Sequence, residues 1–92
     1  MKFKKNNKFI INSSCISTSI EDRSVILNIE NGIYYELNHT ASFIWNCLKQ
    51  DYIFDKIVIE LMNKFNIDEK SVVNSLENTL NQCIGLDFIK KI

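Results

Sequence analysis

The sequence predicts an α+β domain in which three antiparallel strands precede three helices. Short segments rich in β-branched residues occupy the first 37 residues, and apolar residues recur at helical spacing from residue 41 onward. Strands that come first and helices that follow indicate an α+β arrangement. The last two helices are separated only by residues 66–68, as in a helix-turn-helix, so we expect a winged helix-turn-helix-like fold.

The three strands are expected at residues 15–20, 24–29 and 33–37. The chain has no proline, so its two glycines are the main turn signals, and Gly32 lies between the second and third strands. A loop of residues 31–32 would place Leu27 opposite Glu36, whereas a loop of residues 30–32 pairs Leu27 with Tyr35. The second register leaves Tyr34 and Glu36 on one face and gathers these apolar residues on the other: Val25, Leu27, Ile29, Ile33, Tyr35 and Leu37. We therefore predict the three-residue loop, with Gly32 in the left-handed region.

The helices follow from apolar stripes, the first of which runs to about Gln50. Asn38 is a suitable N-cap for the first helix and Asp68 for the third. Asn66 can close the second helix, and Gly85 is the expected C-terminal stop of the third. The stripes consist of Ala41, Ile44, Trp45 and Leu48; then Phe54, Ile57, Val58, Leu61, Met62 and Phe65; then Val72, Val73, Leu76, Leu80, Cys83 and Ile84.

Length and composition indicate one globular domain of 92 residues, 46% hydrophobic and 24% charged. We expect residues 1–8 to form a flexible basic arm and residues 9–92 to form the domain, with Leu86, Phe88 and Ile89 folding back onto its core. Eleven basic and 11 acidic side chains give zero net charge, which argues against a dedicated nucleic-acid binder. No apolar run is long enough for a signal peptide or a membrane span, so we expect a soluble cytoplasmic protein.

The sequence contains no recognisable catalytic or metal-binding motif. Its three cysteines are far apart, so a disulfide framework and a zinc site are both disfavoured, and buried reduced thiols are expected at Cys47 and Cys83. The one histidine, His39, is expected to be solvated in the first turn of a helix. It lies about 12 Å from Cys47 by helical rise, too far for a nucleophile pair. We therefore expect no enzyme activity, no metal and no cofactor.

Binding is the remaining possibility, and the third strand is the candidate surface. If the strands pair in order, this strand is a free sheet edge that a peptide could extend through main-chain hydrogen bonds. A loop or the N-terminal arm covering the edge is the alternative.

One segment resembles a known family. Residues 32–45, Gly-Ile-Tyr-Tyr-Glu-Leu-Asn-His-Thr-Ala-Ser-Phe-Ile-Trp, are similar to the G-x-Y-[YF]-x-L-N-x-T-[AG]-x-x-[IL]-W signature of PqqD-like proteins. These proteins are precursor-peptide recognition elements of ribosomal natural-product pathways. Stand-alone members occur in lasso-peptide and quinone-cofactor systems, and the resemblance extends over roughly residues 15–89.

The resemblance implies that the leader segment of a precursor peptide adds as an antiparallel strand to the third strand, in a groove against the third helix. Carried onto this chain, the implied peptide-binding residues are Ile33, Tyr34, Tyr35, Glu36, Leu37, Val72, Val73, Leu76 and Leu80. The implied partners are the precursor peptide and a modifying enzyme such as a leader peptidase, a cyclase or a radical SAM enzyme. No nucleic acid or membrane partner is expected, and the protein is a monomer or a homodimer.

The alternative from a different class is a winged-helix DNA-binding regulator. The third helix would then read DNA bases, for which arginine is the commonest side chain at guanine edges. This helix begins with Asp68 and Glu69 and contains no arginine, so the peptide-binding interpretation is favoured.

Overall fold

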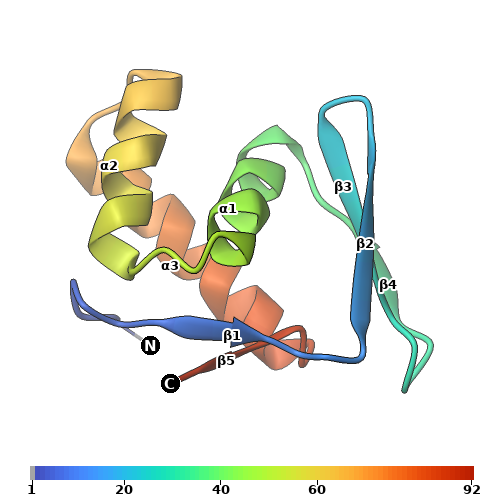
Figure 1. The fold of residues 1–92 in the computed structure, drawn as a ribbon. Helices are drawn as coiled ribbons and strands as arrows, with labels where there is room; N and C mark the ends of the chain where they lie inside the picture. Colours follow the sequence, from blue (N-terminus) through green and yellow to red (C-terminus); the bar gives the residue numbers. More distant parts are fainter. Residues whose placement is uncertain (1) are drawn as a thin grey trace.

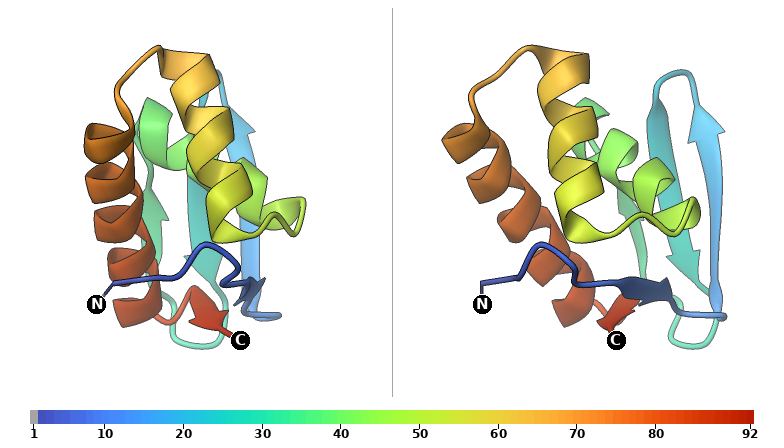
Figure 2. Two further views of the ribbon diagram at one scale, coloured as in Figure 1. Left: turned by 90° about the vertical axis from the view of Figure 1, so that its left-hand side faces the viewer. Right: turned by 60° about the vertical axis from the view of Figure 1, so that its left-hand side comes forward.

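The computed structural model describes residues 2–92 and contains three helices and five short strands (Figure 1). In chain order these are β1 (Phe9–Ile11), β2 (Cys15–Ile20), β3 (Arg23–Asn28), β4 (Tyr34–Glu36), α1 (His39–Lys49), α2 (Phe54–Phe65), α3 (Glu69–Gly85) and β5 (Ile89–Lys91). The expected three-stranded antiparallel sheet is confirmed as β2–β3–β4, and the three helices follow it. The helices cover one face of this sheet and leave the other face open (Figures 1 and 2).

The register of the β3–β4 hairpin differs from the predicted one by one residue. Val25 lies opposite Glu36 and Leu27 lies opposite Tyr34. The loop therefore has four residues, 29–32, closed by a hydrogen bond from the Gly32 N–H to the Asn28 carbonyl. Gly32 has a φ of +75°, in the left-handed region as expected.

The correct register reverses the faces of β3. The pattern of apolar residues predicted Val25, Leu27 and Ile29 as core, but the buried residues are Ser24, Ile26 and Asn28. Among the described residues no buried side-chain N or O atom lacks a hydrogen-bond partner. Asn28 Oδ1 accepts from the Glu30 N–H, and the backbone N–H of Ser24 donates to Ser42 Oγ at 2.8 Å. Buried polar groups that have hydrogen-bond partners cost little free energy. Choosing the buried face of β3 by the number of apolar residues alone therefore gave the wrong face.

Helix boundaries follow the capping residues closely. Asn38 accepts from the Ala41 N–H, Asp68 accepts from the Ser71 N–H, and Asn66 closes α2, all as predicted; Asn66 does so in the left-handed conformation. Gly85 is a partial exception because it is the last helical residue and its φ is not left-handed. The left-handed residue that turns the chain is Asp87, with φ 63°.

A second sheet, not predicted from the sequence, joins the two ends of the chain. β1 and β5 pair antiparallel, with Ile11 opposite Ile89. The expected return of the C-terminal tail to the core is confirmed, because Phe88 and Ile89 are buried.

The segment before β1 was expected to be a flexible arm. Residue 1 lies outside the described residues, and residues 2–8 contact the helices. Phe3 packs edge-on against the ring of Phe9, and its N–H donates to Glu77 on α3. The Phe54 N–H donates to the Asn7 carbonyl at the start of α2. These contacts tie the segment to the domain, which its polar composition did not indicate.

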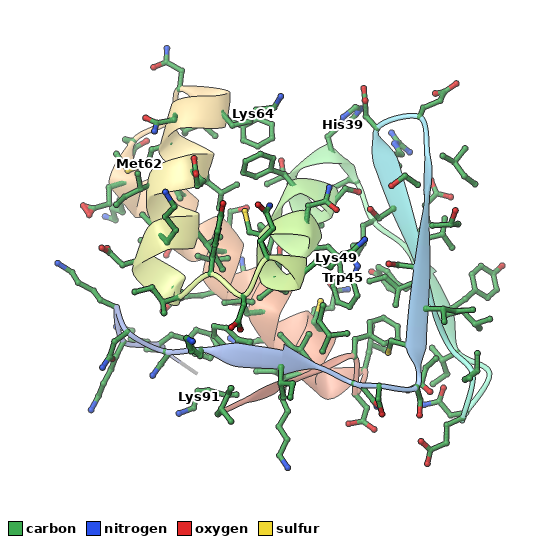
Figure 3. All side chains as sticks on the ribbon, in the orientation of Figure 1. His39, Trp45, Lys49, Met62, Lys64 and Lys91 are labelled. Carbon is green, nitrogen blue, oxygen red and sulfur yellow. The ribbon has the colours of Figure 1, made fainter. Side chains whose placement is uncertain are left out.

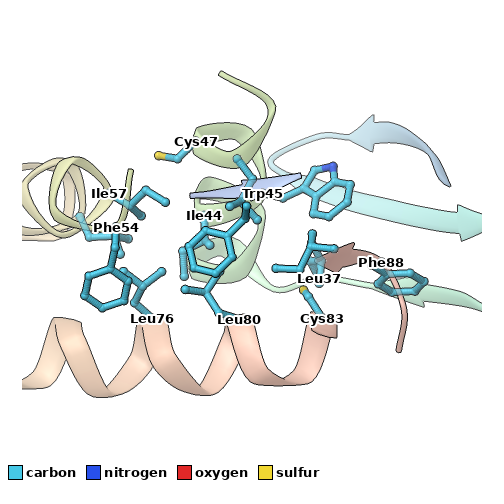
Figure 4. Packing of buried hydrophobic residues seen from close by; sticks show 14 of the residues in the cluster. Leu37, Ile44, Trp45, Cys47, Phe54, Ile57, Leu76, Leu80, Cys83 and Phe88 are labelled. Atoms are coloured by element: carbon cyan, nitrogen blue, oxygen red, sulfur yellow. The ribbon is translucent and has the colours of Figure 1, made fainter. Parts of the chain in front are cut away.

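The core lies between the helices and the inner face of the sheet. In Figure 4, Leu76 points from α3 towards Phe54, Leu80 towards Ile44 and Cys83 towards Leu37. Trp45 is 2% exposed and points from α1 towards the sheet (Figure 3), where its Nε1 donates to Ser17 Oγ. Cys47 and Cys83 are buried free thiols, as expected.

Candidate functional site: the free edge of the sheet

β4 is an edge strand, since it pairs with β3 and, within residues 2–92, with no other strand. The Leu37 N–H donates to the Ser24 carbonyl, and the Asn28 N–H donates to the Ile33 carbonyl. In an antiparallel ladder the hydrogen-bonded pairs alternate, so Tyr35 also directs its backbone groups towards β3. The N–H and C=O groups of Tyr34 and Glu36 consequently point towards the free edge.

A side-chain hydrogen bond connects the edge strand to α3. The amide of Gln82 donates to the hydroxyl of Tyr35, which is half-buried on the inner face of the sheet. Residues three and four apart share a helix flank, so Ser75, Thr79 and Gln82 lie on the flank of α3 that faces β4. In the right panel of Figure 2 the C-terminal end of α3 lies nearest to the sheet, and its N-terminal end points away from it.

Apart from the half-buried Tyr35 and from Val73, the expected site residues fall into two groups in the structure. Ile33, Tyr34 and Glu36 are exposed on or next to the edge strand, with Tyr34 71% exposed. Four others form part of the core and have little surface to offer a ligand: Leu37, Val72, Leu76 and Leu80.

Val73 is the remaining expected residue, and it lies on the opposite flank of α3. It is nine residues from Gln82, which at 100° per residue places the two side chains half a turn apart. Glu77, one turn after Val73, accepts a hydrogen bond from the N-terminal segment at Phe3. Val73 is half-buried against the core on that side. The expected helix residues all came from the apolar stripe, and the polar flank of Ser75, Thr79 and Gln82 beside it was not among them.

The outer face of the β2–β3–β4 sheet is apolar. The register predicted from the sequence placed Val25 and Leu27 in the core and so did not predict this face. Ile16, Leu27 and Tyr34 form one row across the three strands. Together with Val25 and Thr18 they line a hollow of about 360 Å³. Ile16 and Tyr34 are both more than half exposed. The Arg23 guanidinium and the Glu36 carboxylate form an ion pair of 3.2 Å at one end of this face.

The titratable groups do not assemble into a catalytic arrangement in the described part of the chain. Burial raises the pKa of the Cys47 and Cys83 thiols to about 11, with the Glu60 carboxylate adding to the effect at Cys47. Both thiols are therefore protonated near neutral pH. His39 is exposed at the start of α1, near the β2–β3 turn (Figure 3).

Within residues 2–92, no group of three His, Cys, Asp or Glu side chains is placed to hold a metal ion. No helix in that range is long and apolar enough to cross a membrane.

Two solved structures share this fold. One is described as TbiB1 in complex with the TbiA(beta) leader peptide; it is 24% identical, the match covers 87% of this chain and 93% of that chain, and the TM-score is 0.84. The other is described as lasso peptide synthetase B1 complexed with the leader peptide; it is 15% identical, with coverage of 89% and 96% and a TM-score of 0.81. At these identities the likeness establishes the fold. No protein with a curated description matches the sequence significantly.

The sequence itself matches a family model. The model for coenzyme PQQ synthesis protein D (PqqD) matches residues 23–89, which run from the first residue of β3 to the first residue of β5 and make up well over half of the chain. The match includes the free edge strand and the helix connected to it through Tyr35 and Gln82, and this chain is therefore a member of the PqqD family.

Proposed function

We propose that this protein binds the leader segment of a ribosomally made precursor peptide as an added strand on β4. The observation that carries the proposal is the outward direction of the Tyr34 and Glu36 backbone groups on an uncovered edge. An extended peptide can satisfy these groups, and main-chain pairing of this kind supplies affinity in strand addition. The two similar structures were both solved with a leader peptide, which supports the same class of ligand.

The proposed site has three parts. Ile33, Tyr34 and Glu36 supply the edge, Tyr35 forms the floor on the inner face, and the flank of α3 formed by Ser75, Thr79 and Gln82 forms the wall. The buried residues expected from the sequence support the site from beneath: Leu37, Val72, Leu76 and Leu80. In this arrangement Val73 takes no part.

The proposed role is presentation rather than catalysis. A bound leader holds the adjoining core peptide near a modifying enzyme at high effective concentration, which raises the rate of modification without any catalytic group in this domain. A leader peptidase, a cyclase and a radical SAM enzyme are all chemically suitable partners, since each acts on the peptide beyond its leader. The leader must be long enough to pair with β4 while the core segment of the precursor still reaches the enzyme.

The structure gives the DNA-binding alternative no basic recognition helix. A recognition helix needs cations to contact phosphates and base edges. Over its 17 residues, α3 carries one cation, Lys70, beside the acidic Glu69 at its start.

The direct test is calorimetry in which a leader peptide, taken from a precursor encoded in the same gene cluster, is titrated into the purified protein. Glu36→Pro removes the outward N–H and should weaken binding at least about tenfold. Glu36→Ala removes the same side chain but keeps the N–H, and should bind within about threefold of the wild type. Equal affinity of the folded Glu36→Pro variant and the wild type would exclude β4 as the site.

The wall of the site is tested by a second matched pair. Thr79→Asp places a charge beside the bound strand, where its desolvation is costly, and should weaken binding. Asn74→Asp places the same charge on an exposed part of α3 about 140° around the helix from Thr79, and should leave affinity unchanged. If both variants weakened binding equally, the flank of α3 beside β4 would have no special role.

A further inference from the structure

Tyr34 belongs to two surfaces at once. Its backbone groups point to the free edge, and its side chain lies on the outer face of the sheet in a row with Leu27 and Ile16. The side chain is 71% exposed and lines the apolar hollow of that face. Any strand added at the edge therefore meets an apolar surface on the side of the sheet away from α3.

The pleat determines which peptide residues meet this surface. Tyr34 and Glu36 would each form a hydrogen-bonded pair with a residue of an antiparallel added strand, and directly opposed side chains lie on the same face. The peptide residues opposite Tyr34 and Glu36 thus project onto the outer face. The residue between them, opposite Tyr35, projects inward towards α3.

The two outward positions have different surroundings. The position opposite Tyr34 is flanked by an exposed aromatic ring and, behind it, by the half-buried Leu27. The position opposite Glu36 faces a carboxylate whose one ion-pair partner in the described residues is Arg23. A second carboxylate there would be repelled, whereas a neutral or basic side chain is compatible.

We infer that the outer face of the sheet selects the leader by its side chains. The bound strand carries an apolar or aromatic residue opposite Tyr34. Two positions earlier in the peptide, opposite Glu36, it carries a residue that is not acidic. The order follows from antiparallel pairing. This inference rests on the proposed function and adds sequence selectivity on the face of the sheet that α3 does not touch.

The area of the face favours a peptide strand over a second copy of this chain as the occupant. Three strands about 4.8 Å apart and at most six residues long give a face of roughly 10 by 20 Å. A stable protein–protein interface needs about 800 Å² from each partner, several times more than this face offers. One added strand, in contrast, lies directly beside Tyr34 and Glu36.

Selection from a phage-displayed library of random 12-residue peptides tests the inference without knowledge of the natural leader. Peptides enriched on the wild-type domain should share an apolar residue preceded by a non-acidic residue two positions earlier. On Tyr34→Lys the preference for an apolar residue at that position should fall about two- to fivefold, the range expected for one cross-strand pair.

Ile16→Lys is the matched control. Ile16 lies in the same row and is also more than half exposed, but β2 is separated from the edge strand by β3. An added strand would lie roughly 14 Å from β2, so the enriched pattern should not change. An equal change in both variants would mean that peptides lie across the face instead of along the edge, and would overturn the inference.

A charge-reversed pair tests the second position. Arg23→Glu combined with Glu36→Arg retains the ion pair and should reverse the preference from non-acidic to non-basic. If the peptides enriched on the wild type fail to bind Glu36→Pro but show no pattern at the two outward positions, the inference is wrong and the proposed function stands. If those peptides bind Glu36→Pro as well as the wild type, the edge is not the site and both fail.

Discussion

Gln82 on α3 donates a hydrogen bond to the hydroxyl of Tyr35 on β4, across 47 positions of sequence. Tyr35 directs its backbone towards β3 and its side chain towards α3, so this contact holds the edge strand and the helix together. It places the polar flank of α3 beside the free edge and leaves Val73 on the far side.

Trp45→Ala should destabilise the domain by about 3–5 kcal/mol, as expected for truncation of a buried aromatic side chain. Trp45 is 2% exposed and is the residue of α1 that hydrogen-bonds to Ser17 of the sheet. Urea unfolding monitored by circular dichroism would measure the loss. Trp45→Phe serves as the control and should lose less, because most of the apolar contact remains. An unchanged unfolding midpoint for Trp45→Ala would show that the α1–sheet contact is not part of the core.

The two glycines should respond to alanine with opposite signs. Gly32 has a φ of +75°, so Gly32→Ala should destabilise the domain by about 1 kcal/mol even though space is available for a methyl group. Gly85 has an ordinary φ within α3 and equally open surroundings, so Gly85→Ala should stabilise the domain by up to about 1 kcal/mol. Thermal unfolding of the two variants beside the wild type decides this. Destabilisation by Gly85→Ala would restore Gly85 as the helix stop that the sequence predicted.

The N-cap of α3 should make stability depend on pH in acid. Hydrogen bonds from the side chain and backbone of Ser71 lower the pKa of Asp68. A depressed folded-state pKa gives stability that is present above the unfolded pKa, about 3.9, and is lost as the pH falls through the lower folded value. Asp68→Asn should therefore lose less stability than the wild type between about pH 5 and pH 2, measured by urea midpoints across that range. Parallel pH profiles for the two proteins would contradict this.

The buried thiols should be unreactive in the folded protein. Because burial raises the pKa of Cys47 and Cys83 to about 11, both remain neutral at pH 8, and iodoacetamide should modify them only after unfolding. The neutral thiols contribute stability that is present below the unfolded pKa of about 8.5 and is lost as the pH rises through about 11. The half-buried Cys15 should react first. Mass spectrometry after timed alkylation would measure this, and equal rates in native and denatured protein would disprove the burial.

The sequence was sufficient for features that depend on local chemistry. The caps at Asn38 and Asp68, the end of α2 at Asn66 and the apolar stripes of the helices follow from side-chain type and spacing, and they were predicted correctly. The β1–β5 pair could not be predicted, because strands of three residues carry no usable periodicity and their pairing joins the two ends of the chain.

The candidate site was only partly predictable for a related reason. The edge strand follows from the order of the strands, but which residues lie on each face of the sheet depends on the register. The register was predicted wrongly because the inner face of β3 carries the buried polar residues Ser24 and Asn28. The expected helix residues were chosen because they are apolar, and apolar residues at helical spacing mark the core first. The contact between Tyr35 and Gln82, on which the proposed flank of α3 depends, is formed only in the folded chain.

Amide hydrogen exchange of the ¹⁵N-labelled protein, with and without the precursor leader peptide, tests the central claim most directly. In the free protein the Tyr34 and Glu36 amides should exchange rapidly, because they point to the open edge, whereas the Tyr35 amide should already be protected by β3. Binding should then protect Tyr34 and Glu36 selectively. If the leader binds and these two amides continue to exchange as in the free protein, the peptide does not pair with β4 and the account is wrong.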